Sequence, residues 1–295
     1  MERMVFIVNP VAGGGKAKKI IPLIRQTMDE TKIEYDIALT TGPKDAINIA
    51  KESIQKGYTT IVAVGGDGTV NEVAIGILKS GNGTLGIIPS GTGNDLARTL
   101  NIPFNLKQAI EIIIKGSKKN IDIGVVNNSL FLNIASIGFD SEVVKNTQGI
   151  KKRIKLGIAY VIGVLKTIVT FKDKEIQLEI DGIPIDKNII LVAIGNGKYY
   201  GGGLKILPMA IIEDGYFHVC IVNNISKFKL LLLFPSIFIG KHIKLKKYVE
   251  IFKAKKIKII TENQMYLNVD GEIYDIEKET LFTIENEKLA VFVNS

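Results

Sequence analysis

The sequence contains few of the residues that mark disulfide scaffolds or metal centres. It has one cysteine and two histidines among 295 residues. A single cysteine excludes a disulfide framework and a cysteine-based zinc finger, and it is typical of a protein in a reducing compartment. Cys220 lies in the strand-like run YFHVCIV, which predicts a buried and inert thiol. Neither His218 nor His242 lies in a pattern of metal ligands, so we expect no metal at either.

Long hydrophobic runs are also absent. The longest apolar stretches, residues 156–165 and 230–239, have about ten residues each, roughly half the length that a transmembrane helix requires. The start of the chain, MERMVFIVNP, predicts a strand and lacks the features of a signal peptide. We therefore expect a cytoplasmic protein that is soluble or bound peripherally to the inner face of the membrane.

Positive charge is concentrated in two segments that are also strongly apolar. The formal net charge is +8; residues 143–172 carry seven Lys/Arg and no acid, and residues 227–258 carry ten with one acid, Glu250. Basic and apolar residues side by side favour an anionic membrane surface, where each Lys or Arg contributes about 1 kcal/mol. Neither segment has the base-reading residues of a nucleic-acid surface, so we expect no nucleic-acid partner. The alternative is a core helix with a solvated lysine face.

The chain divides into two halves by its pattern of predicted elements. In the first half, strand-like runs at residues 5–8, 33–39, 60–64 and 84–88 alternate with helical patterns at residues 18–30, 46–55, 71–80, 95–100 and 106–115. This alternation predicts a parallel sheet covered by helices on both faces. From about residue 125, strands separated by Asp-Gly and Asn-Gly turns predict an antiparallel β-sandwich. We expect the two domains to pack with a cleft between them.

A glycine-rich turn joins a strand to a helix in IVAVGGDGTVNEVAIGIL, residues 61–78. Glycines let backbone amides approach an anion, and the start of the following helix adds positive charge, so the turn predicts a phosphate site. It does not match the dinucleotide fingerprint, because Asn71 stands where Gly or Ala is needed, and it is not a Walker loop. Asp67 would repel phosphate directly, which indicates Mg²⁺ or a hydrogen bond to a ligand hydroxyl or water. Alternatively, Asp67 only shapes the turn.

Two further loops are predicted at the same edge of the sheet. The turn SGTG, residues 90–93, follows the next strand and precedes a helix that Asn94 or Asp95 would cap. Another loop starts at Asn9, directly after the first strand. Because open α/β sheets bind ligands beyond the carboxyl ends of their strands, the three loops together predict a nucleotide site.

The combined motifs resemble the diacylglycerol kinase catalytic-domain family, specifically its bacterial soluble lipid kinases. GGDGTVNEV and PSGTGNDLAR are accompanied by IVNPVAGGGKA, TTGPKDA and a late NVDGE, in the family's order. The resemblance implies a kinase that uses ATP and Mg²⁺ to phosphorylate the hydroxyl of a membrane lipid, most simply diacylglycerol, and it allows a homodimer. It also implies a three-layer α/β domain similar to NAD kinase and phosphofructokinase at residues 1–124 plus about 287–295, and a β-sandwich lipid-binding domain at residues 125–286.

The resemblance also assigns nucleotide-binding residues. They are Asn9, Pro10, Val11, Ala12, Gly13, Thr40, Gly65, Gly66, Asp67, Gly68, Thr69, Val70, Asn71, Glu72, Gly91, Thr92, Gly93, Asn94 and Asp95. Asp122 would join Asp67 and Asp95 in a Mg²⁺-linked network, unless it is only a residue at the boundary of a helix or strand.

The resemblance also assigns roles to two Asp-Gly turns in the second half of the chain, one catalytic and one in metal binding. Asp270 and Glu272 lie where the family places its proton acceptor; Glu272 is our preference for the base and Asp270 for orienting the hydroxyl or the metal, but the sequence does not separate them. Asp214 and the carbonyls of Ile211 and Tyr216 would hold a structural Mg²⁺. A plain hairpin turn is the alternative at both places.

The sequence leaves alternatives open for both the substrate and the class of function. Phosphatidylglycerol, a monoacylglycerol and a sphingoid base or ceramide are alternative substrates, because the shape of an apolar cavity selects acyl chains. A soluble kinase of the NAD kinase type and a lipid-binding protein without turnover are the alternative functions. The SGTGND motif and the basic, apolar segments argue against the first, and the retained acidic residues argue against the second.

Overall fold

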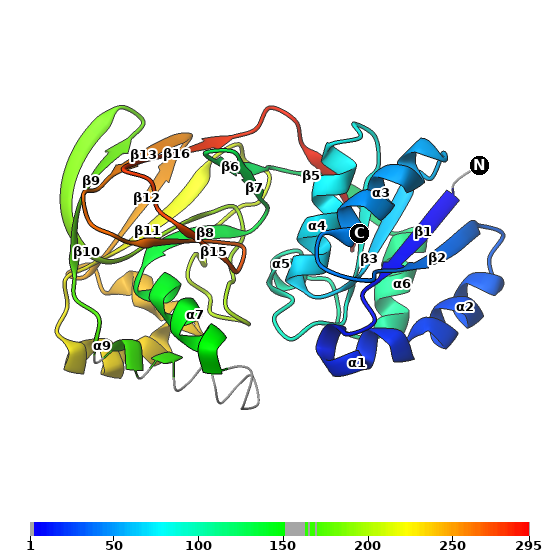
Figure 1. Cartoon of the computed structure of the whole chain (residues 1–295), viewed down its shortest axis with the longest axis horizontal. Helices are drawn as coiled ribbons and strands as arrows, with labels where there is room; N and C mark the ends of the chain where they lie inside the picture. Colours follow the sequence, from blue (N-terminus) through cyan, green and yellow to red (C-terminus); the bar gives the residue numbers. More distant parts are fainter. Residues whose placement is uncertain (1–2, 151–162, 165, 169, 295) are drawn as a thin grey trace. The chain divides into compact units, whose positions relative to one another are not determined.

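The computed structural model describes residues 3–150, 163–164, 166–168 and 170–294, which form two compact units (Figure 1). Unit 1 comprises Met1–Asp122 and Glu287–Ser295, and unit 2 comprises Ile123–Asn286. The division lies close to the expected boundary at residue 124. Much of the first basic and apolar segment, residues 151–162, lies outside the described residues.

Unit 1 is built on a six-stranded sheet of order β2-β1-β3-β4-β17-β5. The strands are β1 (Arg3–Val8), β2 (Glu34–Leu39), β3 (Thr60–Gly65), β4 (Thr84–Pro89), β5 (Ser117–Ile121) and β17 (Leu289–Val293). All neighbours are parallel except β5, which runs antiparallel to β17. The last strand of the chain therefore lies beside β4 in the first sheet.

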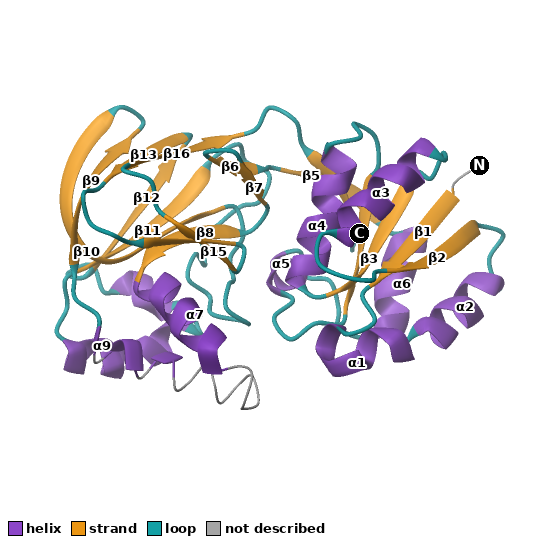
Figure 2. Cartoon of the chain, in the orientation of Figure 1, coloured by secondary structure: helices purple, strands orange, loops and turns teal. Residues whose placement is uncertain are grey.

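Helices cover both faces of this sheet (Figure 2). They are α1 (Ala12–Lys19), α2 (Ile21–Asp29), α3 (Asp45–Gln55), α4 (Asp67–Leu78), α5 (Asp95–Thr99) and α6 (Leu106–Lys115). Phe6 and Val62 of the sheet pack against Ile24 of α2 and Ile113 of α6. Helices α3 and α4 pack against each other and against β1 and β3. Every residue of β3 is buried, as expected for a strand covered on both sides.

The predicted helix at residues 18–30 is wrong in its extent. Two helices replace it, α1 and α2, which are separated by Ile20, with Pro22 in the first turn of α2. Proline is tolerated in a first turn because its missing amide hydrogen has no helical partner there. The parallel α/β class expected for the first half is confirmed.

Unit 2 is an antiparallel β structure. Its strands are β6 (Gly124–Val126), β7 (Ser129–Phe131), β8 (Ile134–Gly138), β9 (Lys174–Ile180), β10 (Ile183–Gly195), β11 (Phe217–Asn223), β12 (Val249–Ala254), β13 (Lys256–Ile260), β14 (Tyr266–Val269), β15 (Glu272–Asp275) and β16 (Glu279–Ile284). The long strand β10 pairs with β9 through its first half and with β8 and β11 through its second half. Through these pairings β10 connects β9 to β8 and β11 within one sheet, and the antiparallel class expected for the second half is confirmed.

Alternate residues of the central strands of unit 2 enter two different cores. Val192 and Val219 contribute to the sandwich interior, whereas Ala193 and Cys220 face a second core. The second core is closed by helices α7 (Phe139–Ile150) and α9 (Lys227–Leu233) and the short 3₁₀ helices η1 (Phe234–Ile237) and η2 (Lys241–Lys244). Among the described helices, none has the length and hydropathy that crossing a bilayer requires.

Candidate functional site

The two glycine-rich turns of unit 1 are in direct backbone contact. The amides of Ser90 and Gly91 donate to the carbonyl of Gly65, at 2.9 and 3.2 Å. A Cβ atom on Gly91 would lie 2.3 Å from the Cα of Gly66, far inside van der Waals contact. The turns after β3 and β4 can pack this closely only because both positions are glycine.

The carboxylate of Asp67 fixes the second turn to the first. Its Oδ1 accepts hydrogen bonds from the amides of Asp95, at 2.6 Å, and Leu96, at 3.4 Å, which are the first two residues of α5. An acid at a helix start satisfies free amides and interacts favourably with the helix dipole. Asn94 occupies the N-cap position of this helix, as expected, but its side chain makes no capping bond; Asp67 of the neighbouring turn accepts from the first amides instead.

Asn94 instead closes its own loop. Its backbone adopts a left-handed conformation with φ of 54°. Its side chain accepts from the amide of Gly91 and donates to the carbonyl of Gly91, both at 3.0 Å. Arg98 adds a bond from Nε to the carbonyl of Gly93 at 3.2 Å. The loop between β4 and α5 is thus held in one shape before any ligand binds.

The first loop joins the other two through Asn9 and Gly13. The amide nitrogen of the Asn9 side chain donates to Thr69 Oγ1 at 3.1 Å, and its oxygen accepts from the amide of Val11 at 3.2 Å. A Cβ atom on Gly13 would lie 2.1 Å from the carbonyl oxygen of Ser90. All three predicted loops therefore come together at the carboxyl ends of β1, β3 and β4.

The other predicted nucleotide-binding residues divide by exposure. Gly68 and Thr92 are exposed, and Val11 is strongly exposed, so these positions are accessible to a ligand. Val70 is buried in α4, so its side chain serves the core. Glu72 accepts a hydrogen bond from the amide of Lys44 at 2.9 Å, which ties α4 to the start of α3. Pro10, Ala12 and Asn71 are half-buried, and Thr40 is buried directly after β2.

The carboxylate of Asp122 has a cationic partner in unit 1. Lys288 Nζ lies 2.8 Å from its Oδ1, and the side chain of Asp122 is buried. In the described part of the chain, no three His, Cys, Asp or Glu side chains gather closely enough to hold a metal ion. The expected network of Asp67, Asp95 and Asp122 is not such a group, so a metal here would depend on ligands that a nucleotide brings.

In unit 2, Asp270 is part of a β-hairpin and organises the neighbouring strand. Asp270 and Gly271 connect β14 to β15 with φ values of 47° and 96°, as in a two-residue hairpin turn with both residues left-handed. The Asp270 carboxylate accepts hydrogen bonds from the amides of Leu132, Asn133 and Ile134, at 2.8, 3.1 and 2.9 Å. It therefore holds the chain that enters β8.

Glu272 is exposed and makes a different contact. The hydroxyl of Tyr274 donates to its Oε2 at 2.7 Å. Burial, together with this hydrogen bond, raises the pKa of Tyr274 to about 12, so the phenol stays a donor at neutral pH. The structure thus separates the two acids that the sequence left equivalent: Asp270 is committed to backbone amides, whereas Glu272 is accessible.

A buried polar network behind this hairpin was missed from the sequence. Asn268 accepts from the amide of Gly271 at 3.0 Å and donates to Ser136 Oγ at 3.3 Å and to Asp140 Oδ2 at 3.4 Å. Ser136 also donates to Asp140. Burial raises the pKa of Asp140 to about 6, although these hydrogen bonds oppose the shift. Only the asparagine in NVDGE, two residues before Asp270, gave a local signal.

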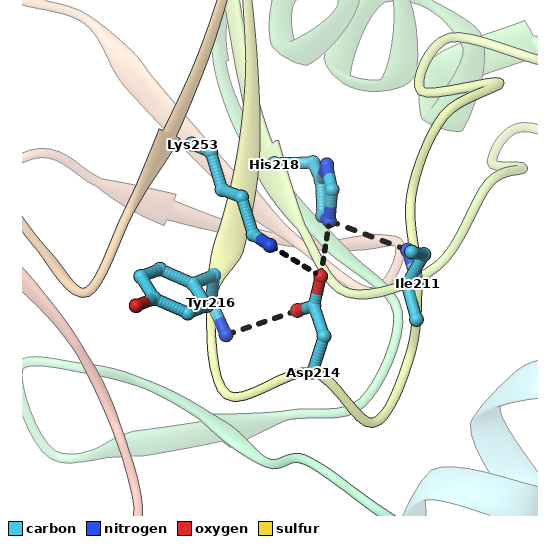
Figure 3. A network of polar contacts seen from close by, with 5 residues as sticks. All are labelled: Ile211, Asp214, Tyr216, His218 and Lys253. Atoms are coloured by element: carbon cyan, nitrogen blue, oxygen red, sulfur yellow. Dashed lines mark hydrogen bonds and ion pairs between the residues drawn. The ribbon is translucent and has the colours of Figure 1, made fainter.

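The second Asp-Gly turn of unit 2 forms an ion-pair cluster around Asp214 (Figure 3). Lys253 Nζ lies 3.0 Å and His218 Nε2 lies 3.2 Å from its Oδ2, and its Oδ1 accepts from the amide of Tyr216 at 3.1 Å. His218 and Lys253 are direct neighbours across β11 and β12. Burial opposes ionisation of Asp214, but the bonds from Lys253 and His218 outweigh it and lower the pKa of this carboxyl.

This cluster does not fit the expected structural Mg²⁺. The ammonium of Lys253 already neutralises Asp214, and it also lies 4.3 Å from the centroid of the Tyr216 ring. The contact of Ile211 in this cluster is through its amide nitrogen, 3.3 Å from His218 Nε2. A divalent cation with Asp214, Ile211 and Tyr216 as ligands would lie close to the Lys253 ammonium, and repulsion between the two cations disfavours binding while Lys253 is in place.

We expect Lys253→Met to make thermal stability depend more strongly on Mg²⁺. Without Mg²⁺ the variant should lose about 1 kcal/mol or less, because the lysine is half-exposed. Mg²⁺ should then restore stability by replacing the ammonium. Thermal unfolding in EDTA and in rising Mg²⁺ measures this, with Lys255→Met as the control. An equal Mg²⁺ response in the variant and the unsubstituted protein would contradict it.

We also expect Asp140→Asn to change how stability depends on pH. Folding raises the pKa of Asp140 from 3.8 to about 6. The contribution of this group to folding stability is therefore fully present below pH 3.8, the pKa in the unfolded chain, and it is lost as the pH rises through about 6. The variant should therefore gain on the order of 3 kcal/mol relative to the unsubstituted protein between about pH 4 and about pH 7. Urea unfolding across this range measures the difference, with Glu142→Gln on the same helix as the control. A difference that does not vary with pH would refute the prediction.

Two family comparisons together span nearly the whole chain. The diacylglycerol kinase catalytic domain matches residues 3–126, and the YegS C-terminal NAD kinase beta sandwich-like domain matches residues 133–293. A diacylglycerol kinase of Staphylococcus carnosus is 32% identical over 272 residues, which are 92% of this chain and 89% of that protein.

Solved structures agree with the sequence comparisons. A diacylglycerol kinase from Bacillus anthracis has a TM-score of 0.76 at 26% identity, covering 99% of this chain and 97% of that one. An NAD kinase from Archaeoglobus fulgidus in complex with ATP has a TM-score of 0.52 at 15% identity, covering 100% and 94%, and shares the fold. The resemblance inferred from the motifs is confirmed: the chain belongs to the diacylglycerol kinase catalytic-domain family.

Proposed function

We propose that this protein is a lipid kinase that transfers the γ-phosphate of ATP to the hydroxyl of diacylglycerol, giving phosphatidic acid. The observation that carries the proposal is the packing of three glycine-containing loops in unit 1, fixed by Asp67 and by the contact of Gly66 with Gly91. The similarity to enzymes named diacylglycerol kinase along 92% of the chain supports the lipid acceptor.

The nucleotide phosphates would bind to the backbone of these loops. The start of α4, a helix of twelve residues, offers free amides and the positive end of the helix dipole. Gly68 lies there with open space at its Cα, so a phosphate can approach the main chain. A loop that is already fixed by Asn94 loses little conformational entropy when it binds.

Mg²⁺ would enter this site together with the nucleotide. In proteins it often keeps several waters and is held by one or two carboxylates plus substrate phosphates, which suits loops that lack a carboxylate cluster of their own. Bound there, Mg²⁺ supplies neutralisation of the charge that develops on the transferring phosphoryl group.

Glu272 would act as the proton acceptor. Tyr274 holds Oε2 of this carboxylate, so the other oxygen is available to the lipid hydroxyl. As the hydroxyl oxygen bonds to the γ-phosphorus, the bond to the bridging oxygen of ADP breaks and the hydroxyl proton passes to Glu272. Asp270 would support this step indirectly, because its hydrogen bonds to backbone amides hold the hairpin in place.

The test is transfer of labelled γ-phosphate from ATP, with Mg²⁺, to lipids in mixed micelles. The acceptors are diacylglycerol, phosphatidylglycerol, a monoacylglycerol, a sphingoid base and ceramide, with NAD and water as controls. Labelled phosphatidic acid is the expected product. Labelling of another lipid would support a lipid kinase with a substrate other than diacylglycerol. Labelling of NAD would indicate a soluble kinase. ATP binding without any transfer would indicate a protein that binds lipid without turnover.

We expect Gly91→Ala to weaken ATP binding about tenfold or more, a loss of about 1.4 kcal/mol. The added methyl group would meet the main chain of Gly66 and push the two turns apart. Isothermal titration with ATP measures the affinity. Gly42→Ala is the matched control, since a Cβ there meets nothing within 4 Å. Equal ATP affinity in both variants would contradict the role of the contact between the turns.

A further inference from the structure

We propose that a surface of unit 2 formed by α9, η1 and η2, here called the α9 face and comprising residues 227–247, docks on an anionic lipid bilayer. Its apolar side chains would enter the interface and its lysines would bind the headgroups. The inference rests on the proposed function only in that the substrate would come from the same bilayer. Docking itself can be measured without nucleotide or turnover.

The outer side of the α9 face is strongly apolar. Five large hydrophobic side chains within twelve residues are exposed, namely Phe228 (71%), Leu231 (46%), Leu232 (61%), Phe238 (53%) and Ile239 (62%). Neither α9 nor η1 contains a buried residue. So many exposed large apolar side chains on one short segment are unusual on a protein that meets only water, and they indicate an interaction surface.

The inner side of the same segment packs on unit 2 and holds the segment there. Leu230, Leu233, Phe234 and Ile237 pack against the second core of unit 2, which also contains residues from α7 and β10. An amphipathic surface helix would place polar residues opposite such a contact. In α9, phenylalanine and leucine occupy the exposed side instead. The alternative interpretation, a core helix with a solvated lysine face, does not explain these exposed apolar side chains.

Lysines lie on both sides of these apolar residues along the chain. Exposed lysines flank them at positions 227, 229, 241, 244, 246 and 247. Residues 226–249 contain no aspartate or glutamate, and Glu250, the next acid, pairs with Lys187 at 2.6 Å. Each lysine near an anionic membrane surface contributes about 1 kcal/mol, in addition to the gain from burying the apolar side chains.

The same features favour a bilayer over other occupants. Protein interfaces are depleted of lysine, and two copies of the α9 face would bring like charges together. A nucleic acid would gain from the lysines but not from exposed leucine and isoleucine. Only an anionic bilayer offers an apolar layer next to negative charge, which is the combination that this surface complements.

Buried contacts attach the α9 face to unit 2. His242 of η2 is buried, and its Nε2 lies 2.9 Å from the carbonyl oxygen of Ile206. Gly240 turns the chain between η1 and η2 with φ of 69°, and its Cα lies against Pro208. Because the surface is already formed, docking does not require the segment to fold on the membrane.

The test is co-sedimentation of the full chain with vesicles of phosphatidylcholine, with and without phosphatidylglycerol. We expect binding only when phosphatidylglycerol is present, with weaker binding at high salt. Phe228→Gln with Leu232→Gln should weaken binding about tenfold or more, and so should Lys241→Glu with Lys244→Glu. Ile183→Gln is the control for losing an exposed apolar side chain, and Lys32→Glu with Lys79→Glu in unit 1 is the control for the charge change.

The outcomes separate this proposal from the proposed function. Unchanged binding of both test variants would overturn the docking role of the α9 face, as would absence of binding by the unsubstituted protein. If the test variants lose vesicle binding but transfer phosphate normally in detergent micelles, the result would support both the docking surface and the kinase activity. Selective loss of binding in a protein without any transfer would support docking while the proposed function fails.

Discussion

Two carboxylates, those of Asp67 and Asp270, accept hydrogen bonds from backbone amides of a neighbouring loop, and each shapes one of the candidate sites. Asp67 binds the first amides of α5 and so joins the turns after β3 and β4. Asp270 binds three successive amides where the chain enters β8. In both cases an acid in a glycine turn satisfies groups that would otherwise need water, and the turn keeps its shape without a ligand. Preorganisation of this kind is what phosphoryl transfer requires of a protein.

This use of acids leaves a small set of groups for chemistry. In unit 1 the accessible groups include the main chain around Gly68 and the exposed Thr92, which suit phosphate oxygens. Of the two acids in the NVDGE motif of unit 2, Glu272 is the exposed one, and it is oriented by Tyr274, while Asn268 and Asp140 stabilise the hairpin from behind. Asp214 and Lys253 form a further ion pair that stabilises the turn before β11. Most acids named in the motifs therefore stabilise the fold, and among the motif acids of unit 2 Glu272 is the one that is exposed.

The fold class was predictable because burial leaves a local pattern in the sequence. The continuous apolar run of β3 and the alternation of β9 both reflect which faces are covered. The partners of Asp270 lie 136 to 138 residues away along the chain, and no local pattern could reveal them. The same limit hid Asp140, which reaches Asn268 across 128 residues, and Lys253, which meets Asp214 only because β12 pairs with β11. The outward direction of Phe228 and Leu232 likewise depends on which side of α9 packs on unit 2.

The most direct measurement is the rate of phosphate transfer and the thermal midpoint, determined together for Glu272→Gln and Asp270→Asn. We expect Glu272→Gln to lose about two orders of magnitude or more in rate, as for a general base, with a midpoint close to that of the unsubstituted protein. Asp270→Asn should lower the midpoint, because it weakens the bonds to three backbone amides. A Glu272→Gln variant that transfers phosphate at the unsubstituted rate would contradict the account, since the accessible acid would then have no part in the reaction.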